Sequence, residues 1–506
     1  MFRFNKTSTK AVIITISLLF VVQIVCFAQT TVQREIPITC SSDEARAAFI
    51  EARDALDMGR TNDARALLDK AIKKDPKFAC AYLFKAYSPN SAAEWKSNME
   101  LAVANKSAVS EGEQILIEMK MTFLNNDAEK RFVLAKKLVE KYPASQRALL
   151  VLAGEHQGRK EYAKARNLMN TAMQINPEFP LPHRDLGFSS LFDEPKDFDL
   201  AEKHMIKFVE LRPDEASTHI GLGDVYRAQQ KLKKARDAYA KAAEINPESD
   251  VAFSKKGHAN TYLGYYEEAR ADFKQAQEVA KDNSKATWAN YATFTYLYAG
   301  DAKSALAANQ KVIDEIDDMG IPEDQLIGPK MGTHFNRAMM AMYNGKFDIA
   351  EEALKQRAMY MLQEAEEVAS DDFTRGQKAS IALTDGILAA RRGDYRTALL
   401  KADENTKLLE PDNNPRKLEG YQRLRGLIAL LQKNYNEAVE HYQKANVNNV
   451  QVKHELALAH EGLGNVEQAY KLFKEVAEFN FNWVGYAVIR NEAIEKTKIR
   501  TKIRTK

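Results

Sequence analysis

A motif that recurs about every 34 residues constrains the fold of this chain more than any other feature of the sequence. Its clearest copy comprises Leu222, Gly223, Tyr226, Ala235, Tyr239, Ala242 and Pro247. Using the same spacing, copies begin near residues 45, 79, 112, 146, 182, 216, 250, 286, 331, 379, 419 and 450. A repeat of this length is one supersecondary unit that cannot bury its apolar face alone, so neighbouring units must stack.

Each repeat has the pattern of two antiparallel helices. Apolar residues recur at steps of three and four, which is typical of amphipathic helices. Pro247 disfavours helical geometry at Asn246, and Asn tolerates the left-handed conformation that ends helices, so the second helix should stop there. Five glycines should form the turns between paired helices: Gly264, Gly300, Gly345, Gly393 and Gly464. The sequence therefore predicts an all-α protein.

The repeated residues resemble those of the tetratricopeptide repeat (TPR) family. The resemblance is strongest over 216–249 and good over 146–179, 250–283 and 450–483. It implies a right-handed superhelical solenoid of antiparallel helix hairpins, whose first helices line a concave groove for proteins or peptides. Some family members clamp a peptide carboxylate with Lys and Asn at the fifth and ninth places of a unit. In none of the units do these places hold that pair, so a carboxylate clamp is not indicated.

The same register predicts which side chains face the groove in the best-matched units. The candidates are Ile220, Asp224, Arg227, Ser254, His258, Thr261, Tyr262, Asn290, Phe294 and Tyr298. Aromatic residues and Arg mixed with short polar groups are enriched at binding hot spots. The alternative is that these side chains pack against neighbouring helices.

The N-terminus has the pattern of an export signal. Three basic residues lie within Met1–Lys10, an apolar run follows, and Cys26-Phe27-Ala28 offers small residues at a cleavage site. We expect cleavage after Ala28 and a periplasmic or secreted protein. The alternatives are an inner-membrane anchor formed by 11–33 and lipidation at Cys26. A membrane association is expected only if this segment is retained.

The repeats and their interruptions suggest a domain organisation. After the signal peptide (1–28), we expect an extension (29–44), a TPR array (45–319) and a Gly/Pro linker (320–330). A TPR-like array (331–495) and a frayed basic tail (496–506) should follow. An acidic run between Tyr360 and Lys378 indicates an extended helix followed by a surface loop, and a functional lid is the alternative.

Two cysteines remain after the predicted cleavage. Cys40 precedes the first predicted helix, and Cys80 opens the third. First helices of adjacent units run side by side, and an oxidising compartment permits a disulfide. A Cys40–Cys80 bridge and two separate thiols are both compatible with the sequence.

Composition and motifs point to binding rather than catalysis. Residues 29–495 carry 64 basic and 70 acidic side chains, a poor composition for a nucleic-acid partner. We found no nucleophile elbow, phosphate-binding loop or paired Cys-x-x-Cys, and His454 and His460 are wrongly spaced for a zincin. The sequence thus predicts a non-enzymatic scaffold of the cell envelope, without cofactor or metal, that binds a protein or peptide. The alternatives are an envelope hydrolase or glycan/peptide carrier with a site in 317–378, and an anchored subunit of an outer-membrane assembly complex.

Overall fold

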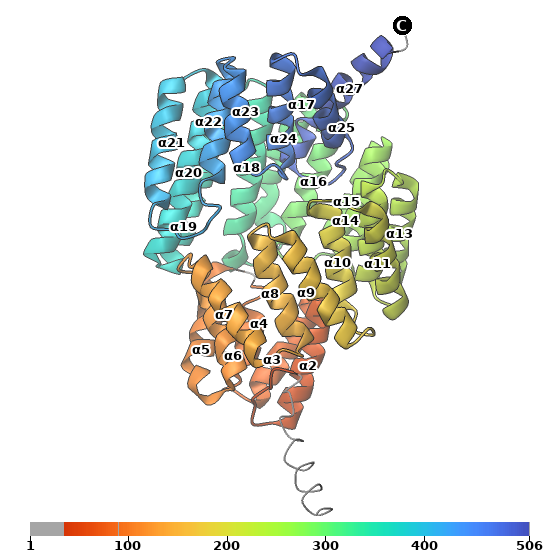
Figure 1. The fold of residues 1–506 in the computed structure, drawn as a ribbon, viewed down its shortest axis with the longest axis vertical. Helices are drawn as coiled ribbons and strands as arrows, with labels where there is room; N and C mark the ends of the chain where they lie inside the picture. The colour runs from red at the N-terminus through yellow and green to blue at the C-terminus, as the bar shows by residue number, and fades with distance from the viewer. Residues whose placement is uncertain (1–34, 90, 505–506) are drawn as a thin grey trace, which may run out of the picture.

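The computed structural model describes residues 35–89 and 91–504, and side chains up to Lys498, and it is built from helices without strands over this part of the chain (Figure 1). The predicted signal peptide and its cleavage site therefore lie outside the described residues. The α-helices are α2 (Asp43–Asp57), α3 (Thr61–Lys74), α4 (Ala79–Lys85), α5 (Ala92–Ala104), α6 (Glu111–Met121), α7 (Ala128–Lys141), α8 (Gln146–Gly158), α9 (Tyr162–Ile175), α10 (Leu181–Phe192), α11 (Phe198–Leu211), α12 (Ala216–Ala228), α13 (Leu232–Ile245), α14 (Asp250–Leu263), α15 (Tyr266–Val279), α16 (Ser284–Tyr298), α17 (Ala302–Glu315), α18 (Ile327–Tyr343), α19 (Phe347–Val368), α20 (Asp371–Arg392), α21 (Tyr395–Leu409), α22 (Glu419–Leu431), α23 (Tyr435–Lys444), α24 (Val450–Gly462), α25 (Val466–Ala477), α26 (Val484–Ala487) and α27 (Arg490–Arg504).

Consecutive helices pair into hairpins, as the repeats predict, from α2 with α3 to α24 with α25. In the α12–α13 hairpin, Ala235 and Ala242 are fully buried, and the Tyr239 ring packs directly on Gly223. A Cβ atom at residue 223 would lie 2.4 Å from that ring. The repeated Gly and Ala positions are therefore the places where paired helices approach most closely.

The predicted turns are confirmed, and the predicted helix end is partly wrong. All five turn glycines have positive φ values of 68° to 89°. Other hairpins place Lys160, Gln230 or Lys433 in the same left-handed conformation, which the sequence did not reveal. Asn246 is extended (φ −130°) rather than left-handed, because the following proline imposes that geometry, and its Oδ1 accepts a hydrogen bond from the Glu248 N–H.

The interruptions are smaller than predicted. A 3₁₀ turn, Ile316–Asp318, precedes the predicted linker, a second, Glu323–Gln325, lies within it, and α18 already starts at Ile327. The extended helix predicted near 360 is confirmed as α19, but no surface loop follows it. Ala369 turns the chain with φ 52°, the Ser370 hydroxyl caps α20, and residues 371–378 are helical.

The predicted basic tail is also more regular than expected. Helix α27 continues to Arg504 instead of fraying at 496. Lys496 forms an ion pair with Glu461 at 2.5 Å and lies over the Phe473 ring, which fastens the start of the tail to α24 and α25.

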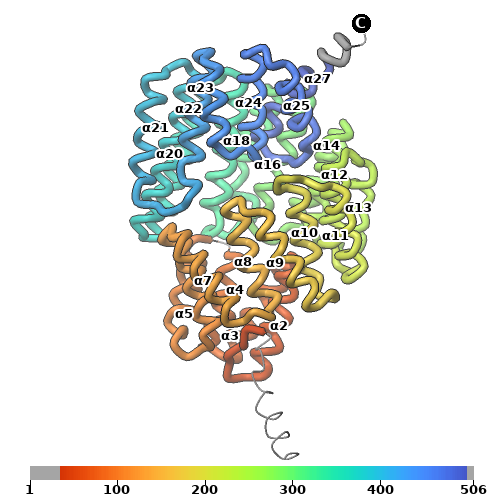
Figure 2. The backbone as a smooth tube through the Cα atoms, in the orientation of Figure 1, coloured from red at the N-terminus to blue at the C-terminus, as the bar shows by residue number. Residues whose placement is uncertain are grey.

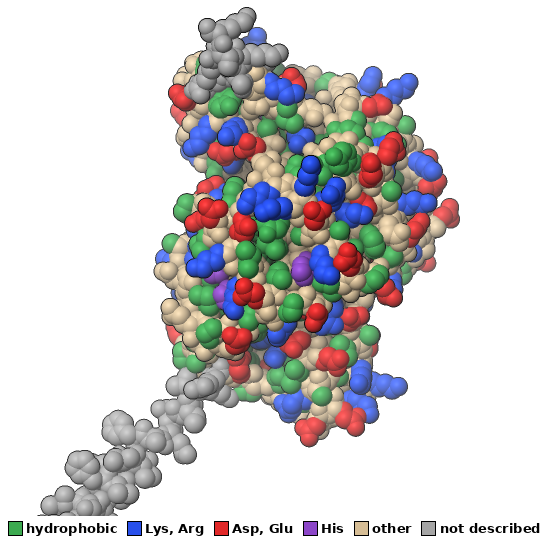
Figure 3. Space-filling view, turned by 90° about the vertical axis from the view of Figure 1, so that its right-hand side faces the viewer, with side chains coloured by type: hydrophobic (Ala, Val, Ile, Leu, Met, Phe, Trp, Pro, Cys, Tyr) green, Lys and Arg blue, Asp and Glu red, His purple; other side chains and the backbone are tan. Residues whose placement is uncertain are grey.

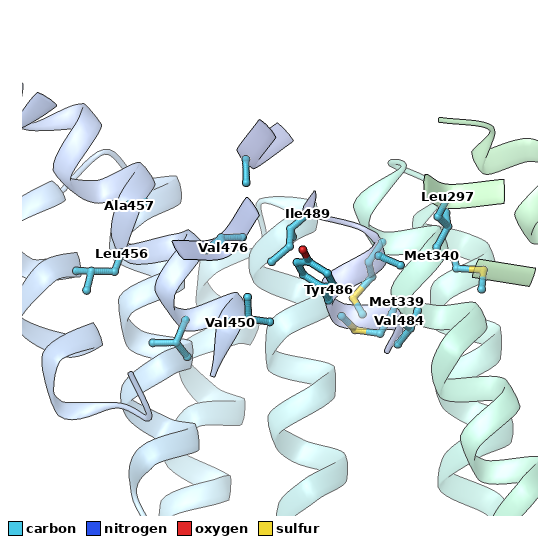
Figure 4. Close-up of a cluster of buried hydrophobic side chains, with 14 of the residues drawn as sticks. Leu297, Met339, Met340, Val450, Leu456, Ala457, Val476, Val484, Tyr486 and Ile489 are labelled. Atoms are coloured by element: carbon cyan, nitrogen blue, oxygen red, sulfur yellow. The ribbon is translucent and has the colours of Figure 1, made fainter. Parts of the chain in front are cut away.

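The stacked hairpins curl until late units meet early ones (Figures 1 and 2). Helix α19 contacts α5, and the Lys160 ammonium on the early side pairs with Glu419 at 2.5 Å. The Tyr162 hydroxyl accepts a hydrogen bond from Asn448 at 3.1 Å. One large apolar cluster runs from Tyr262 to Ala493 and includes Met339 and Met340, so the two predicted arrays share a core (Figure 4).

Candidate functional site

The predicted groove residues lie together, but nearly all of them are covered. Ile220 is partly buried and packs against the small clusters around Ala242 and Tyr239. The others are buried: Asp224, Arg227, Ser254, His258, Thr261, Tyr262, Asn290, Phe294 and Tyr298. The prediction that these side chains form an open groove is therefore wrong, although the register that grouped them is right.

A segment of the same chain covers several of these residues, among them Arg227, His258 and Tyr298. We call residues 478–491, which connect α25 to α27 and contain α26, the return segment. The Phe481 ring lies 4.3 Å from the Arg227 guanidinium carbon. The Asn482 amide donates to His258 Nδ1 at 2.9 Å and accepts from the Tyr298 hydroxyl at 2.7 Å.

Further contacts hold both ends of the return segment. At its start, the Gln230 amide donates to the Glu478 carbonyl and accepts from the Asn480 side chain at 2.7 Å. At its end, the Asn491 amide donates to the Leu297 and Tyr298 carbonyls at 3.1 and 3.2 Å. The segment thus occupies this part of the concave surface as a bound peptide would.

The titratable groups under the return segment respond to burial. Burial, followed by the charges of Arg227 and Lys255, lowers the pKa of His258 well below its ordinary value. The ring is therefore neutral at physiological pH, and its Nδ1 atom can accept the Asn482 hydrogen bond. Burial also raises the pKa of Tyr298, so its hydroxyl stays a donor.

Asp224 organises a charged cluster beneath the segment. Its carboxylate accepts from Arg227 Nη2 at 2.8 Å, from the Tyr239 hydroxyl at 2.6 Å and from Lys255 Nζ at 3.0 Å. Burial alone would raise the pKa of Asp224, but the two cations outweigh it and lower the pKa. The cluster is a support for the return segment and not a free binding surface.

An open cavity lies in the N-terminal part of the molecule. Its volume is about 370 Å³, and it lies among α2, the starts of α8 and α10, and the turn before α12. Met58, Phe179 and Pro180 contribute apolar lining. The charged lining residues are Glu35, Arg53, Asp54, Asp57, Arg60, Arg147, Arg212 and Glu215.

Arg53 is the least satisfied of these groups. Arg147 binds Asp57 through two hydrogen bonds, and Arg60 lies 3.3 Å from Glu215. The Arg53 Nε atom is buried without a hydrogen-bond partner among the described residues. Burial, followed by the charge of Arg147, lowers the pKa of Arg53. An anionic group entering this cavity would relieve both effects.

Sequence reasoning missed this cavity. Arg53 stands at the ninth place of the unit beginning at 45, and Arg147 at the second place of the unit beginning at 146, so the register marked both as concave. Only the stacked structure brings these distant units within reach of Arg212 and Glu215. The repeat register therefore contained this signal, although it lies outside the best-matched units.

The two cysteines carry free thiols in the structure. The Cys80 thiol donates to Glu113 Oε1 at 3.3 Å, and the Cys40 thiol donates to the Ser42 carbonyl at 3.4 Å. Burial, followed by the Glu113 charge, raises the pKa of Cys80. The possible Cys40–Cys80 bridge is therefore not formed, because each sulfur has its own partner.

Two general features bear on the class of protein. In the part of the chain that the structure describes, no helix is long and apolar enough to cross a membrane. Within the same residues, no three His, Cys, Asp or Glu side chains are grouped to hold a metal ion. On the face in Figure 3, basic and acidic side chains are mixed and no broad area has one sign.

These observations define an all-α array of stacked helix hairpins. Sequence models of the tetratricopeptide repeat match residues 51–88, 216–249 and 252–283. The chain contains TPR repeats, and its fold is a TPR solenoid.

The chain is also similar to individual proteins over limited lengths. It is 23% identical to anaphase-promoting complex subunit 3 of Schizosaccharomyces pombe over 198 residues, which is 37% of this chain and 29% of that protein. It is 31% identical to human RanBP2-like and GRIP domain-containing protein 3 over 64 residues, or 13% of this chain and 4% of that protein. The chain thus spans less than a third of the curated relatives it matches.

The chain is also similar to solved structures at low sequence identity. The match to the crystal structure of the APC/C hetero-tetramer Cut9-Hcn1 covers 95% of this chain and 81% of the matched chain, with 15% identity and a TM-score of 0.39. The match to a tetratricopeptide repeat protein from Parabacteroides merdae covers 57% of this chain and 98% of the matched chain, with 12% identity and a TM-score of 0.32.

Proposed function

We propose that this TPR protein is an interaction scaffold of the cell envelope that binds a segment of a partner protein in the Arg53 cavity. The observation that carries the proposal is the contrast between the two parts of the concave surface. The return segment fills the part around Arg227, whereas the cavity around Arg53 is open, and the Arg53 Nε atom has no hydrogen-bond partner among the described residues. A rigid helical array with an open cavity that contains an unpartnered donor is suited to binding another chain.

The cavity favours a partner segment that carries a carboxylate next to an apolar side chain. A carboxylate would pair with Arg53. A hydrogen bond between charged groups contributes about 1.5–3 kcal/mol to binding. The apolar side chain would contact Met58, Phe179 and Pro180. Acidic groups at the rim, Asp54 and Glu215, would disfavour a second acidic side chain in the cavity.

The envelope assignment rests on the N-terminal sequence pattern, which lies outside the described residues. If the signal is cleaved after Ala28, the mature chain starts at Gln29. N-terminal sequencing of the protein purified from its host tests this. A chain that keeps Met1 and fractionates with membranes would contradict cleavage and favour the anchored alternative.

The binding proposal is tested by capture of partners from the envelope fraction with Arg53→Ala and a matched control. Arg236→Ala removes a partly exposed arginine outside the cavity, whose one ion pair among the described residues is with Asp237. We expect Arg53→Ala to weaken the captured partner about tenfold or more and Arg236→Ala to leave it unchanged. Melting curves of both variants show whether the fold is retained. Wild-type affinity in a folded Arg53→Ala variant would refute the proposed site.

A further inference from the structure

A second cavity, separate from the Arg53 cavity, lies where an early helix meets the late ones. It has a volume of about 400 Å³ and is bordered by α5, the 3₁₀ turn Glu323–Gln325, and the helices α18, α19 and α20. Its lining includes three aromatic rings, Trp95, Phe123 and Phe373. It also includes three carboxylates, Asp324, Glu364 and Glu367, and no Lys, Arg or His side chain. The cavity is therefore acidic and aromatic at the same time.

The three carboxylates lack counter-charges. None of them forms an ion pair with a described residue; Glu364 accepts one hydrogen bond, from the Gln377 amide at 3.0 Å. Burial, followed by the charge of Glu367, raises the pKa of Glu364. Gln325, which is 8% exposed and lines the same cavity, has a side-chain oxygen without a hydrogen-bond partner among the described residues. All of these groups are acceptors, so a ligand for them must donate hydrogen bonds and carry positive charge.

The aromatic rings are suited to the same kind of ligand. Phe123 is 55% exposed, and its ring already has the Arg131 guanidinium 4.2 Å and the Lys120 ammonium 5.3 Å from its centroid. Arg131 is in turn paired with Glu155 at 2.9 Å. Trp95 and Phe373 have no such cation over them in the described part of the chain. A cation over an aromatic face is attracted by the ring's electron-rich face, most strongly over Trp.

Other ligand classes fit less well. A bare metal ion needs ligands that converge on one point, and the described residues contain no group of three that does so. A neutral apolar molecule would cover the carboxylates without pairing them, which is costly. A carboxylate or phosphate would be repelled by three negative charges.

We infer that this cavity binds an organic cation, either an alkylammonium or a guanidinium group, between the aromatic rings and the three carboxylates. The group can come from a free polyamine or from a Lys or Arg side chain of a peptide. The inference does not depend on the Arg53 cavity or on its partner. It also gives the carboxylates of the 317–378 region a binding role rather than a hydrolytic one.

The test uses the full mature protein and two probes: spermidine, and an end-blocked tripeptide with a central Arg. Binding is measured by calorimetry and by the change in tryptophan fluorescence, with Trp95→Phe to identify the signal. We expect saturable binding of at least one probe and loss of the fluorescence change in Trp95→Phe. Tighter binding of spermidine identifies a free polyamine as the source, and tighter binding of the tripeptide identifies a partner side chain.

Charge-neutral variants supply the decisive comparison. The double variant Glu364→Gln with Glu367→Gln should weaken the bound probe at least tenfold. Glu366→Gln, an exposed neighbour on α19 that does not line the cavity, should bind like the wild type. Equal affinities of these folded variants would overturn the inference. So would equally tight binding of Mg²⁺, which would indicate a diffuse acidic surface, or the absence of saturable binding of either probe.

Discussion

Removal of the Asp224 carboxylate should destabilise the middle of the array more than any surface change. Asp224 is 5% exposed and accepts hydrogen bonds from Arg227, Tyr239 and Lys255. In Asp224→Ala, the Arg227 guanidinium would remain buried at 1% exposure without an anion, and Lys255 would lose its only ion pair among the described residues. Breaking a buried pair by removing one partner costs about 3–5 kcal/mol.

The effect should be local, because units of a repeat array interact mainly with their neighbours. Hydrogen exchange of peptides from α12, α13 and α14 therefore measures it better than a single melting temperature. We expect exchange to be about 100-fold faster or more in these helices, since each 1.4 kcal/mol is a factor of ten.

Asp237→Ala is the matched control on the next helix. Asp237 is exposed, and its one ion-pair partner among the described residues is Arg236, so its removal should change the free energy of local opening by less than about 0.5 kcal/mol. If Asp224→Ala and Asp237→Ala exchange alike, the buried cluster does not stabilise the array and the assignment of these residues to packing is wrong.

The pH dependence of the same cluster follows from the direction of its pKa shift. The folded-state pKa of Asp224 is lowered. The carboxylate therefore contributes fully to stability at any pH above its unfolded-chain pKa of about 3.9. This contribution is lost as the pH falls through the lower folded value. The difference in local stability between wild type and Asp224→Ala should therefore be constant near neutral pH and become smaller below about pH 4.

Three further changes test other parts of the structure. Ala242→Leu should destabilise the array by about 1–3 kcal/mol because Ala242 is fully buried, whereas the partly exposed Ala240 should tolerate Leu better; equal melting temperatures would show that the register is wrong. Denatured, unreduced mature protein should contain two titratable thiols, Cys40 and Cys80, and a titration that finds none would contradict the free thiols of the structure. Phe481→Ala should remove a cation–π contact of about 2 kcal/mol and make the return segment a preferred site of limited proteolysis, and an unchanged cleavage pattern would mean that this ring does not hold the segment.

Much of the fold could be predicted because its cause is local. The repeat spacing predicts which faces of two paired helices touch. The structure places Gly223, Ala235, Tyr239 and Ala242 in that contact. Even weakly matched units form helix hairpins, because three- and four-residue apolar spacing survives when individual residues change. The glycine turns were predictable for the same reason, since positive φ favours glycine.

The candidate site depended on contacts between residues far apart in the chain. The repeat register placed Arg227, His258 and Tyr298 on the concave side, but it contained nothing about Phe481 or Asn482, more than 180 residues later. Whether a concave surface is open or filled depends on how far the solenoid curls and where its end returns. Small angles between neighbouring hairpins, summed over the whole array, decide that curl, and only the tertiary structure fixes their sum.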